Sequence, residues 1–111
     1  MPRFAKSSAT NPEAYQFYLK GRYLANQSTA EGLKKSLEYF QQAIDKDPGY
    51  AMAYVGLADS YNWLGGGLNY LPPSETLPKA KAAAMKALEL DDALGEAHAA
   101  LAYAEWFYDR D

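Results

Sequence analysis

The sequence of 111 residues contains no cysteine and a single histidine, His98. The missing thiols argue against a disulfide framework, a zinc knuckle and a catalytic cysteine. Without a second histidine a metal site lacks ligands, so we expect no metal and no cofactor. Apolar runs long enough to span a membrane are also missing. Residues 1–10, "MPRFAKSSAT", lack the apolar core of a secretory signal and are predicted to be a flexible tail of a cytoplasmic protein.

An excess of positive charge is missing too, since 11 basic residues stand against 14 acidic ones and the net charge is -3. A nucleic-acid partner is therefore not expected. The glycine-rich stretch "GGGLNYLPP", residues 65–73, lacks the Gly-Lys-Ser/Thr of a phosphate-binding loop and is predicted to be a long non-helical turn. We expect Ser74 or Thr76 to cap the helix that follows, with Pro78 in its first turn. No arrangement of side chains indicates catalysis, so an enzyme is not predicted.

Helical periodicity is what the sequence does have, and no alternating strand pattern accompanies it. We predict an all-α domain of five helices over residues 11–111. Asn11 and Pro12 favour the start of the first helix, because asparagine caps well and proline fits the first helical position. Ser28 or Thr29 is expected to cap the second helix.

A helical corner is predicted within "YFQQAIDKDPGYAMAYVGLADSY", residues 39–61. Proline pushes the preceding residue out of the helical region, so Asp47 and Pro48 should end one helix. We expect Asp47 to cap the next helix, with Pro48 at its first position. The corner recurs 44 residues later, where Asp91 aligns with Asp47. An internal repeat of helix pairs is therefore predicted.

The aligned copies resemble tetratricopeptide repeats, whose pattern has aromatic, Leu-Gly and Tyr positions on one helix and a closing proline, with a period of about 34 residues. The residues that carry the resemblance in the first copy are Phe17, Gly21, Leu24, Ser36, Phe40, Ala43 and Pro48. The resemblance implies a short right-handed superhelix (solenoid) of antiparallel helix pairs. About two and a half units are expected, over residues 14–50, 51–94 and 95–111. It also places His98 and Tyr54 at core aromatic positions.

In this family the inner face of the first helix of each pair lines a concave groove. Carried over by position, the resemblance implies that partner contacts come from Tyr15, Tyr18, Arg22, Asn26, Met52, Val55, Asp59, Asn62, Trp63, Tyr103, Trp106 and Phe107, with Glu96 and Ala99 beside them. Aromatic side chains with Arg and Asn are typical of interface anchors. The alternative for the aromatic residues is structural, with their rings packed against neighbouring helices or the long turn.

The resemblance implies a non-catalytic protein–protein interaction module that binds a peptide or a partner helix. Tyr18, Gly56, Glu96 and Ala100 occupy positions where the acidic-peptide version of the family needs Lys and Asn, so capture of an acidic C-terminal peptide is not expected. Two alternatives stay open. One is self-association, as a homodimer or helix-swapped dimer, through an exposed C-terminal helix. The other is that the chain is a fragment of a longer array in a signalling protein.

Overall fold

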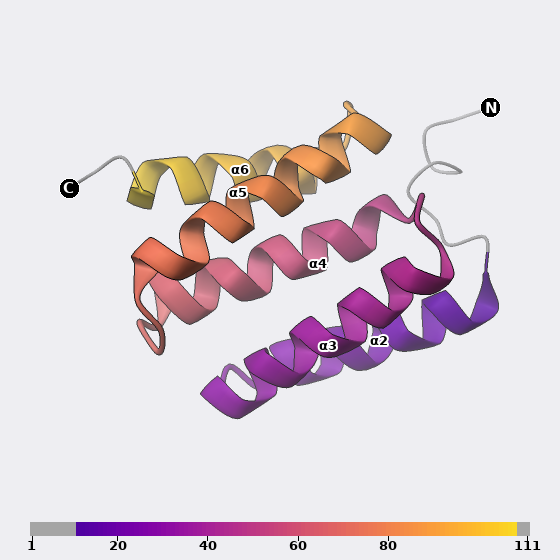
Figure 1. Ribbon diagram of the computed structural model, residues 1–111, viewed down its shortest axis with the longest axis horizontal. Helices are drawn as coiled ribbons and strands as arrows, with labels where there is room; N and C mark the ends of the chain where they lie inside the picture. The colour runs from indigo at the N-terminus through magenta and orange to yellow at the C-terminus, as the bar shows by residue number, and fades with distance from the viewer. Residues whose placement is uncertain (1–10, 109–111) are drawn as a thin grey trace.

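Five α-helices run in alternating directions through the computed structural model, which describes residues 11–108 (Figure 1). The elements are α2 (Pro12–Ala25), α3 (Ala30–Lys46), α4 (Ala51–Asn62), the π-helical segment η1 (Trp63–Gly67), α5 (Pro73–Leu90) and α6 (Gly95–Tyr108). Residues 11–108 contain no strand, and the all-α prediction is confirmed for them. The tail predicted over residues 1–10 lies outside the described residues.

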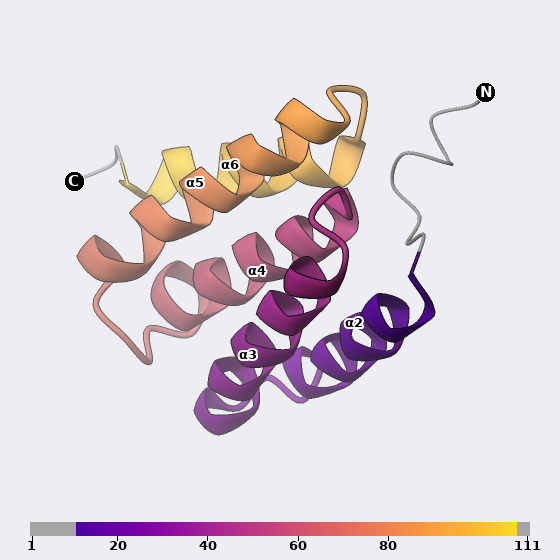
Figure 2. The same ribbon diagram turned by 45° about the vertical axis from the view of Figure 1, so that its right-hand side comes forward.

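Helix α4 occupies the middle of the molecule, between the α2–α3 hairpin and the α5–α6 pair (Figures 1 and 2). It packs against α2, α3, α5 and α6, whereas α2 packs mainly on α3. The molecule is an elongated slab with extents of 42 × 27 × 18 Å. Because α4 contacts both α2 and α6, these three helices form one side of the stack, and α3 and α5 form the other (Figure 2).

The predicted caps of the first two helices are confirmed. The Asn11 side chain accepts hydrogen bonds from the backbone N–H groups of Glu13 and Ala14, and Pro12 is the first residue of α2. The Thr29 hydroxyl accepts from the Gly32 N–H at 2.9 Å and begins α3. Both caps satisfy N–H groups that have no partner within their own helix.

The two corners repeat, but not with the predicted cap. Helix α4 begins at Ala51 with Tyr50 before it, so Asp47 is not its N-cap and Pro48 is not its first residue. The Tyr50 N–H bonds to the Asp47 carbonyl at 2.9 Å, and the Leu94 N–H bonds to the Asp91 carbonyl at 3.2 Å. The turn residues after each aspartate delay the next helix, and a buried side chain at the N-cap position, Tyr50 or Leu94, fixes the corner instead.

The prediction of a non-helical turn over residues 65–73 is wrong in its first part. Gly65–Gly67 continue α4 as the π-helical segment η1, closed by a hydrogen bond from the Leu68 N–H to the Trp63 carbonyl. A Cβ at Gly65 would collide with Thr76 Oγ1, and one at Gly66 would lie 3.1 Å from the Phe107 ring. The glycines serve close packing here, rather than a slack turn.

The start of α5 also differs from the prediction. Neither Ser74 nor Thr76 caps the helix, which begins at Pro73 after Pro72 without a side-chain cap. The Thr76 side chain is buried and donates to the Pro72 carbonyl at 3.5 Å. Pro78 lies inside the helix, beyond its first turn. Two consecutive prolines set the start of α5, because proline already has the backbone angle of a first helical residue.

The core centres on Phe40 of α3, which is fully buried between two glycines. A Cβ on Gly21 of α2 would lie 2.7 Å from the Phe40 ring, and one on Gly56 of α4 would lie 2.5 Å from it. The hydroxyls of Ser36 and Ser60 share a buried hydrogen bond of 2.8 Å between α3 and α4. These contacts hold α2, α3 and α4 at close range.

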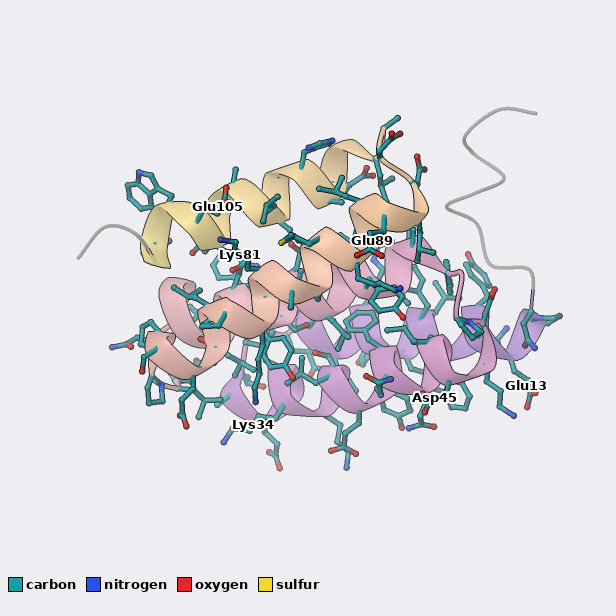
Figure 3. The ribbon with its side chains drawn as sticks, turned by 45° about the horizontal axis from the view of Figure 1, so that its top comes forward. Glu13, Lys34, Asp45, Lys81, Glu89 and Glu105 are labelled. Atoms are coloured by element: carbon teal, nitrogen blue, oxygen red, sulfur yellow. The ribbon has the colours of Figure 1, made fainter. Side chains whose placement is uncertain are left out.

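Helix α6 buries one face and leaves another open. Ala97, Ala100 and Ala104 are buried, whereas His98 is exposed, so its predicted core position is wrong. Its Nε2 lies 2.8 Å from the Asp92 carbonyl oxygen. The physical reason is that, within residues 11–108, no element packs on this face of α6. Further along α6, the Glu105 carboxylate forms an ion pair with the Lys81 ammonium of α5 at 3.7 Å (Figure 3).

Candidate functional site

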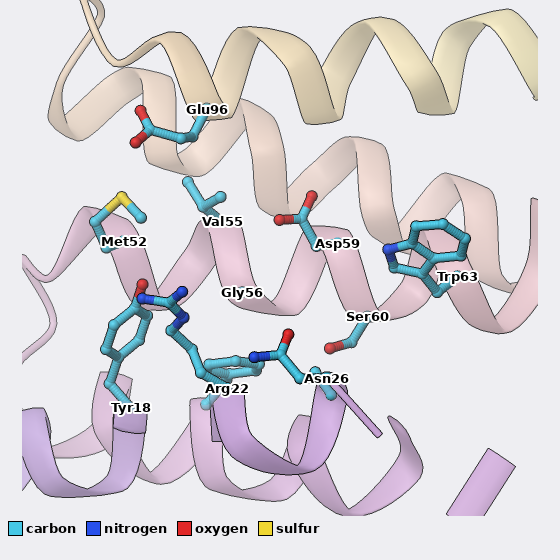
Figure 4. A pocket seen from close by; sticks show the side chains of 12 residues that line it. Tyr18, Arg22, Asn26, Met52, Val55, Gly56, Asp59, Ser60, Trp63 and Glu96 are labelled. Atoms are coloured by element: carbon cyan, nitrogen blue, oxygen red, sulfur yellow. The ribbon is translucent and has the colours of Figure 1, made fainter. Parts of the chain in front are cut away.

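A groove of about 310 Å³ lies on the side of the stack formed by α2, α4 and α6 (Figure 4). Its lining residues are Tyr18, Arg22, Ala25, Asn26, Phe40, Met52, Val55, Gly56, Asp59, Ser60, Trp63 and Glu96. A second hollow of about 250 Å³ adjoins it and shares Asp59 and Trp63. The other lining residues of the second hollow are Asn62, Ala99, Ala100 and Tyr103. The two hollows form one concave surface across three helices.

Most of the residues predicted to contact a partner line this surface, but three do not. Tyr15 is 47% exposed and stacks on Tyr18 with ring centroids 6.5 Å apart. Phe107 is half-buried and packs on Tyr103, and Trp106 is 55% exposed and meets the edge of Phe107. Phe107 thus has the structural role that was the alternative for the aromatic residues.

The wall contributed by α2 combines a tyrosine with an arginine. Tyr18 is almost completely buried and packs on Phe40 and Tyr50 at centroid distances of 5.8 and 5.2 Å. Burial raises the pKa of Tyr18, while the charge of Arg22 and its hydrogen bond to the hydroxyl act in the opposite direction. The Arg22 guanidinium lies 5.8 Å from the centre of the Tyr18 ring. The phenol therefore stays protonated and holds Arg22 at the groove wall.

The opposite wall carries two carboxylates, Asp59 of α4 and Glu96 of α6 (Figure 4). Desolvation raises the pKa of Asp59 to about 6, and the negative charge of Glu96 adds to the effect. The Asp59 side chain is open to the groove, but the surrounding walls displace part of its water. Two negative charges on a partly desolvated surface repel each other. Binding of a proton or of a cation from a ligand relieves this repulsion.

Asn62 has a structural role that the sequence pattern did not predict. Its side-chain amide is buried between α4 and α6 and donates to the Ala100 carbonyl at 3.1 Å. Its Oδ1 is buried and has no hydrogen-bond partner within the described residues. Asn62 therefore ties α6 to α4, and it lines the second hollow.

Four residues that line the 310 Å³ hollow were not predicted as partner contacts: Ala25, Phe40, Gly56 and Ser60. Gly56 and Ser60 follow Met52 at intervals of four residues, so the helical spacing of α4 carries a signal for both. Phe40 comes from α3 and reaches the groove because Gly21 and Gly56 leave space for its ring. That contribution depends on the contact between hairpins, which periodicity within one helix does not specify.

Within residues 11–108, no group of three or more His, Asp or Glu side chains is placed to hold a metal ion. No helix of the same residues combines the length and the hydropathy needed to cross a bilayer. No family model, curated protein or solved structure matches the chain.

Proposed function

We propose that the protein is a non-catalytic, cytoplasmic interaction module of the tetratricopeptide type, which binds a peptide in the groove formed by α2, α4 and α6. The observation that carries the proposal is the concave surface made by the 310 and 250 Å³ hollows. The repeated corners at Asp47 and Asp91 support a stack of helix pairs, because equivalent backbone hydrogen bonds recur at the same offset.

A peptide suits this surface for three reasons. The surface crosses three helices, so an extended chain touches several of them at once. Trp63 offers an indole that is 48% exposed, and aromatic side chains of this kind are typical anchors of interfaces. Arg22 and Asn26 line one wall and offer donors for peptide carbonyl groups.

Two features of the groove argue against catalysis by a hydroxyl nucleophile. Its hydroxyl nucleophile candidate, Ser60, is buried and hydrogen-bonded to Ser36. His98 does not line the groove, so no imidazole is beside Ser60 to activate it. The paired carboxylates are more simply read as contacts for a partner.

The test is a random-peptide display selection against the full chain, followed by binding measurements on a matched pair of variants. Trp63→Leu removes an indole inside the groove and Trp106→Leu removes one outside it, and the two side chains are 48% and 55% exposed. We expect the first change to weaken the selected peptides at least about tenfold, since central aromatic anchors contribute 2 kcal/mol or more, and the second to leave them unchanged. Equal effects, or no selected peptide, would contradict the proposal.

Self-association is a second candidate, because one face of α6 is open. Ala102 is exposed there, and Trp106 is 55% exposed. Exposed apolar side chains that lie together mark interaction surfaces. Sedimentation across a wide concentration range distinguishes the candidates: a dimer that Trp106→Leu dissociates and Trp63→Leu does not would favour self-association, and a monomer at every concentration would exclude it.

A further inference from the structure

The groove has an acidic end whose charge the described residues leave uncompensated. Asp59 and Glu96 come from different helices, α4 and α6, and both line the 310 Å³ hollow. The ion pairs within residues 11–108 are Lys46–Glu13, Lys81–Glu105 and Lys86–Glu89, and none involves either groove carboxylate. The pair therefore meets the solvent, or a ligand, as two negative charges.

Arg22 is the one basic residue in the lining, and it is engaged on the other wall. Its guanidinium lies over the Tyr18 ring, 5.8 Å from the ring centre. The charge of Glu96 raises the pKa of Asp59, in addition to the effect of desolvation. The groove thus separates a basic wall on α2 from an acidic wall on α4 and α6.

An exposed indole next to Asp59 also suits a cationic ligand. Trp63 lines both hollows together with Asp59, and its half-exposed indole can stack on a cation.

We propose that the groove binds a peptide which places a Lys or Arg side chain against Asp59, on the acidic wall that Glu96 extends, with Trp63 beside the cationic group. This inference rests on the proposed peptide-binding function and specifies the chemistry of its ligand. The ammonium or guanidinium donates to the Asp59 carboxylate, and such charge-assisted bonds are stronger than neutral ones. Peptide carbonyl groups then meet Arg22 and Asn26 across the groove, which fixes the direction of the chain.

The pKa of Asp59 supports the same arrangement. At a pKa of about 6 the carboxyl is partly protonated just below neutrality, and desolvation and Glu96 are the causes. Glu96 on α6 and Tyr18 and Arg22 on α2 are the charged or titratable groups that share its groove. A bound cation offsets the repulsion, so peptide affinity should increase as the pH rises through about 6.

The experiment uses the full chain and the random-peptide display library. Selection on the wild-type protein is compared with selection on Asp59→Asn/Glu96→Gln and on a matched control, Asp92→Asn/Glu75→Gln. The control makes the same chemical changes at two exposed residues outside the groove lining. We expect a Lys or Arg at a fixed position in peptides selected by wild type and control, and no such preference with the groove variant.

A second arm needs no protein variant and covers the case in which the groove variant fails to fold. The best peptide is synthesised again with its lysines acetylated or its arginines replaced by citrulline, and we expect at least about a tenfold loss of affinity. Peptides that depend on Trp63 but show no basic position, or that bind equally after neutralisation, would overturn this inference and leave the proposed function standing. A library that yields no Trp63-dependent peptide would overturn both.

Discussion

Helices α4 and α6 begin with the same kind of corner but differ in how completely other helices cover them. Each follows a corner in which an aspartate carbonyl, of Asp47 or Asp91, accepts from the N–H three residues later. Yet α4 is packed on by four other helices, whereas α6 has a face on which no element within residues 11–108 packs. The aligned aromatic position is half-buried at Tyr54 and exposed at His98. Burial of a helix face therefore depends on its neighbours, even where the local sequence repeats.

The largest effect should come from the core that surrounds α4. Phe40→Ala removes a fully buried ring that touches both neighbouring helices, and we expect a loss of about 3–5 kcal/mol in the free energy of unfolding. Phe107→Ala at the α6 end removes a half-buried ring and should cost about 1–2 kcal/mol. Urea unfolding of both variants measures the two losses in the free energy of unfolding. Equal losses would contradict the conclusion that neighbouring helices cover α4 more completely than α6.

Glycine substitutions sharpen the comparison. Gly21→Ala and Gly56→Ala place a methyl group against the rigid Phe40 ring, so we expect each to destabilise by about 1–3 kcal/mol. At Gly95, the first residue of α6, no atom lies within 4 Å of a new Cβ. There Gly95→Ala should be neutral or stabilise by up to about 1 kcal/mol, because alanine loses less backbone entropy. Thermal unfolding measures the sign, and a stabilised Gly56→Ala would refute the close approach of α3 and α4.

Asn62→Ala tests the direct link between α4 and α6. It removes the hydrogen bond to the Ala100 carbonyl, and we expect a loss of about 1 kcal/mol. The amide hydrogens of α6 should exchange faster in this variant, while those of α2 and α3 keep their protection. Equal loosening of all helices would show instead that the contact stabilises the whole fold and not α6 in particular, and unchanged exchange in α6 would show that α6 does not depend on it.

The smallest effect should come from Asp59→Asn and depends on pH. The pKa of Asp59 rises from 3.8 to about 6 on folding, so its contribution to stability is greatest below pH 3.8 and is lost as the pH rises through about 6. The variant should therefore be more stable than wild type above pH 6, by less than about 1 kcal/mol because the side chain is open to water. This advantage should shrink in acid, and a constant difference at all pH values would contradict the raised pKa.

Local signals in the sequence predicted much of the fold. Asn11 and Thr29 cap their helices because a capping side chain bonds to backbone groups two or three residues away. The groove face was predicted from the resemblance to tetratricopeptide repeats, and Arg22, Met52 and Asp59 all line the groove.

Contacts between distant elements could not be predicted in this way. The role of Asn62 depends on Ala100, which lies far along the chain, and the helical geometry of Gly65–Gly67 depends on the closeness of Thr76 and Phe107. The exposure of His98 likewise depends on which elements pack beside α6, and within residues 11–108 none covers His98.

The most direct test of the groove uses the two tryptophans in one spectrum. Each indole N–H gives its own resonance, and Trp63 lines both hollows whereas Trp106 lines neither. During titration with a selected peptide, we expect the Trp63 signal to shift with the occupancy of the groove and the Trp106 signal to stay in place. A shift confined to Trp106, or a bound peptide that moves neither signal, would contradict a binding groove formed by α2, α4 and α6.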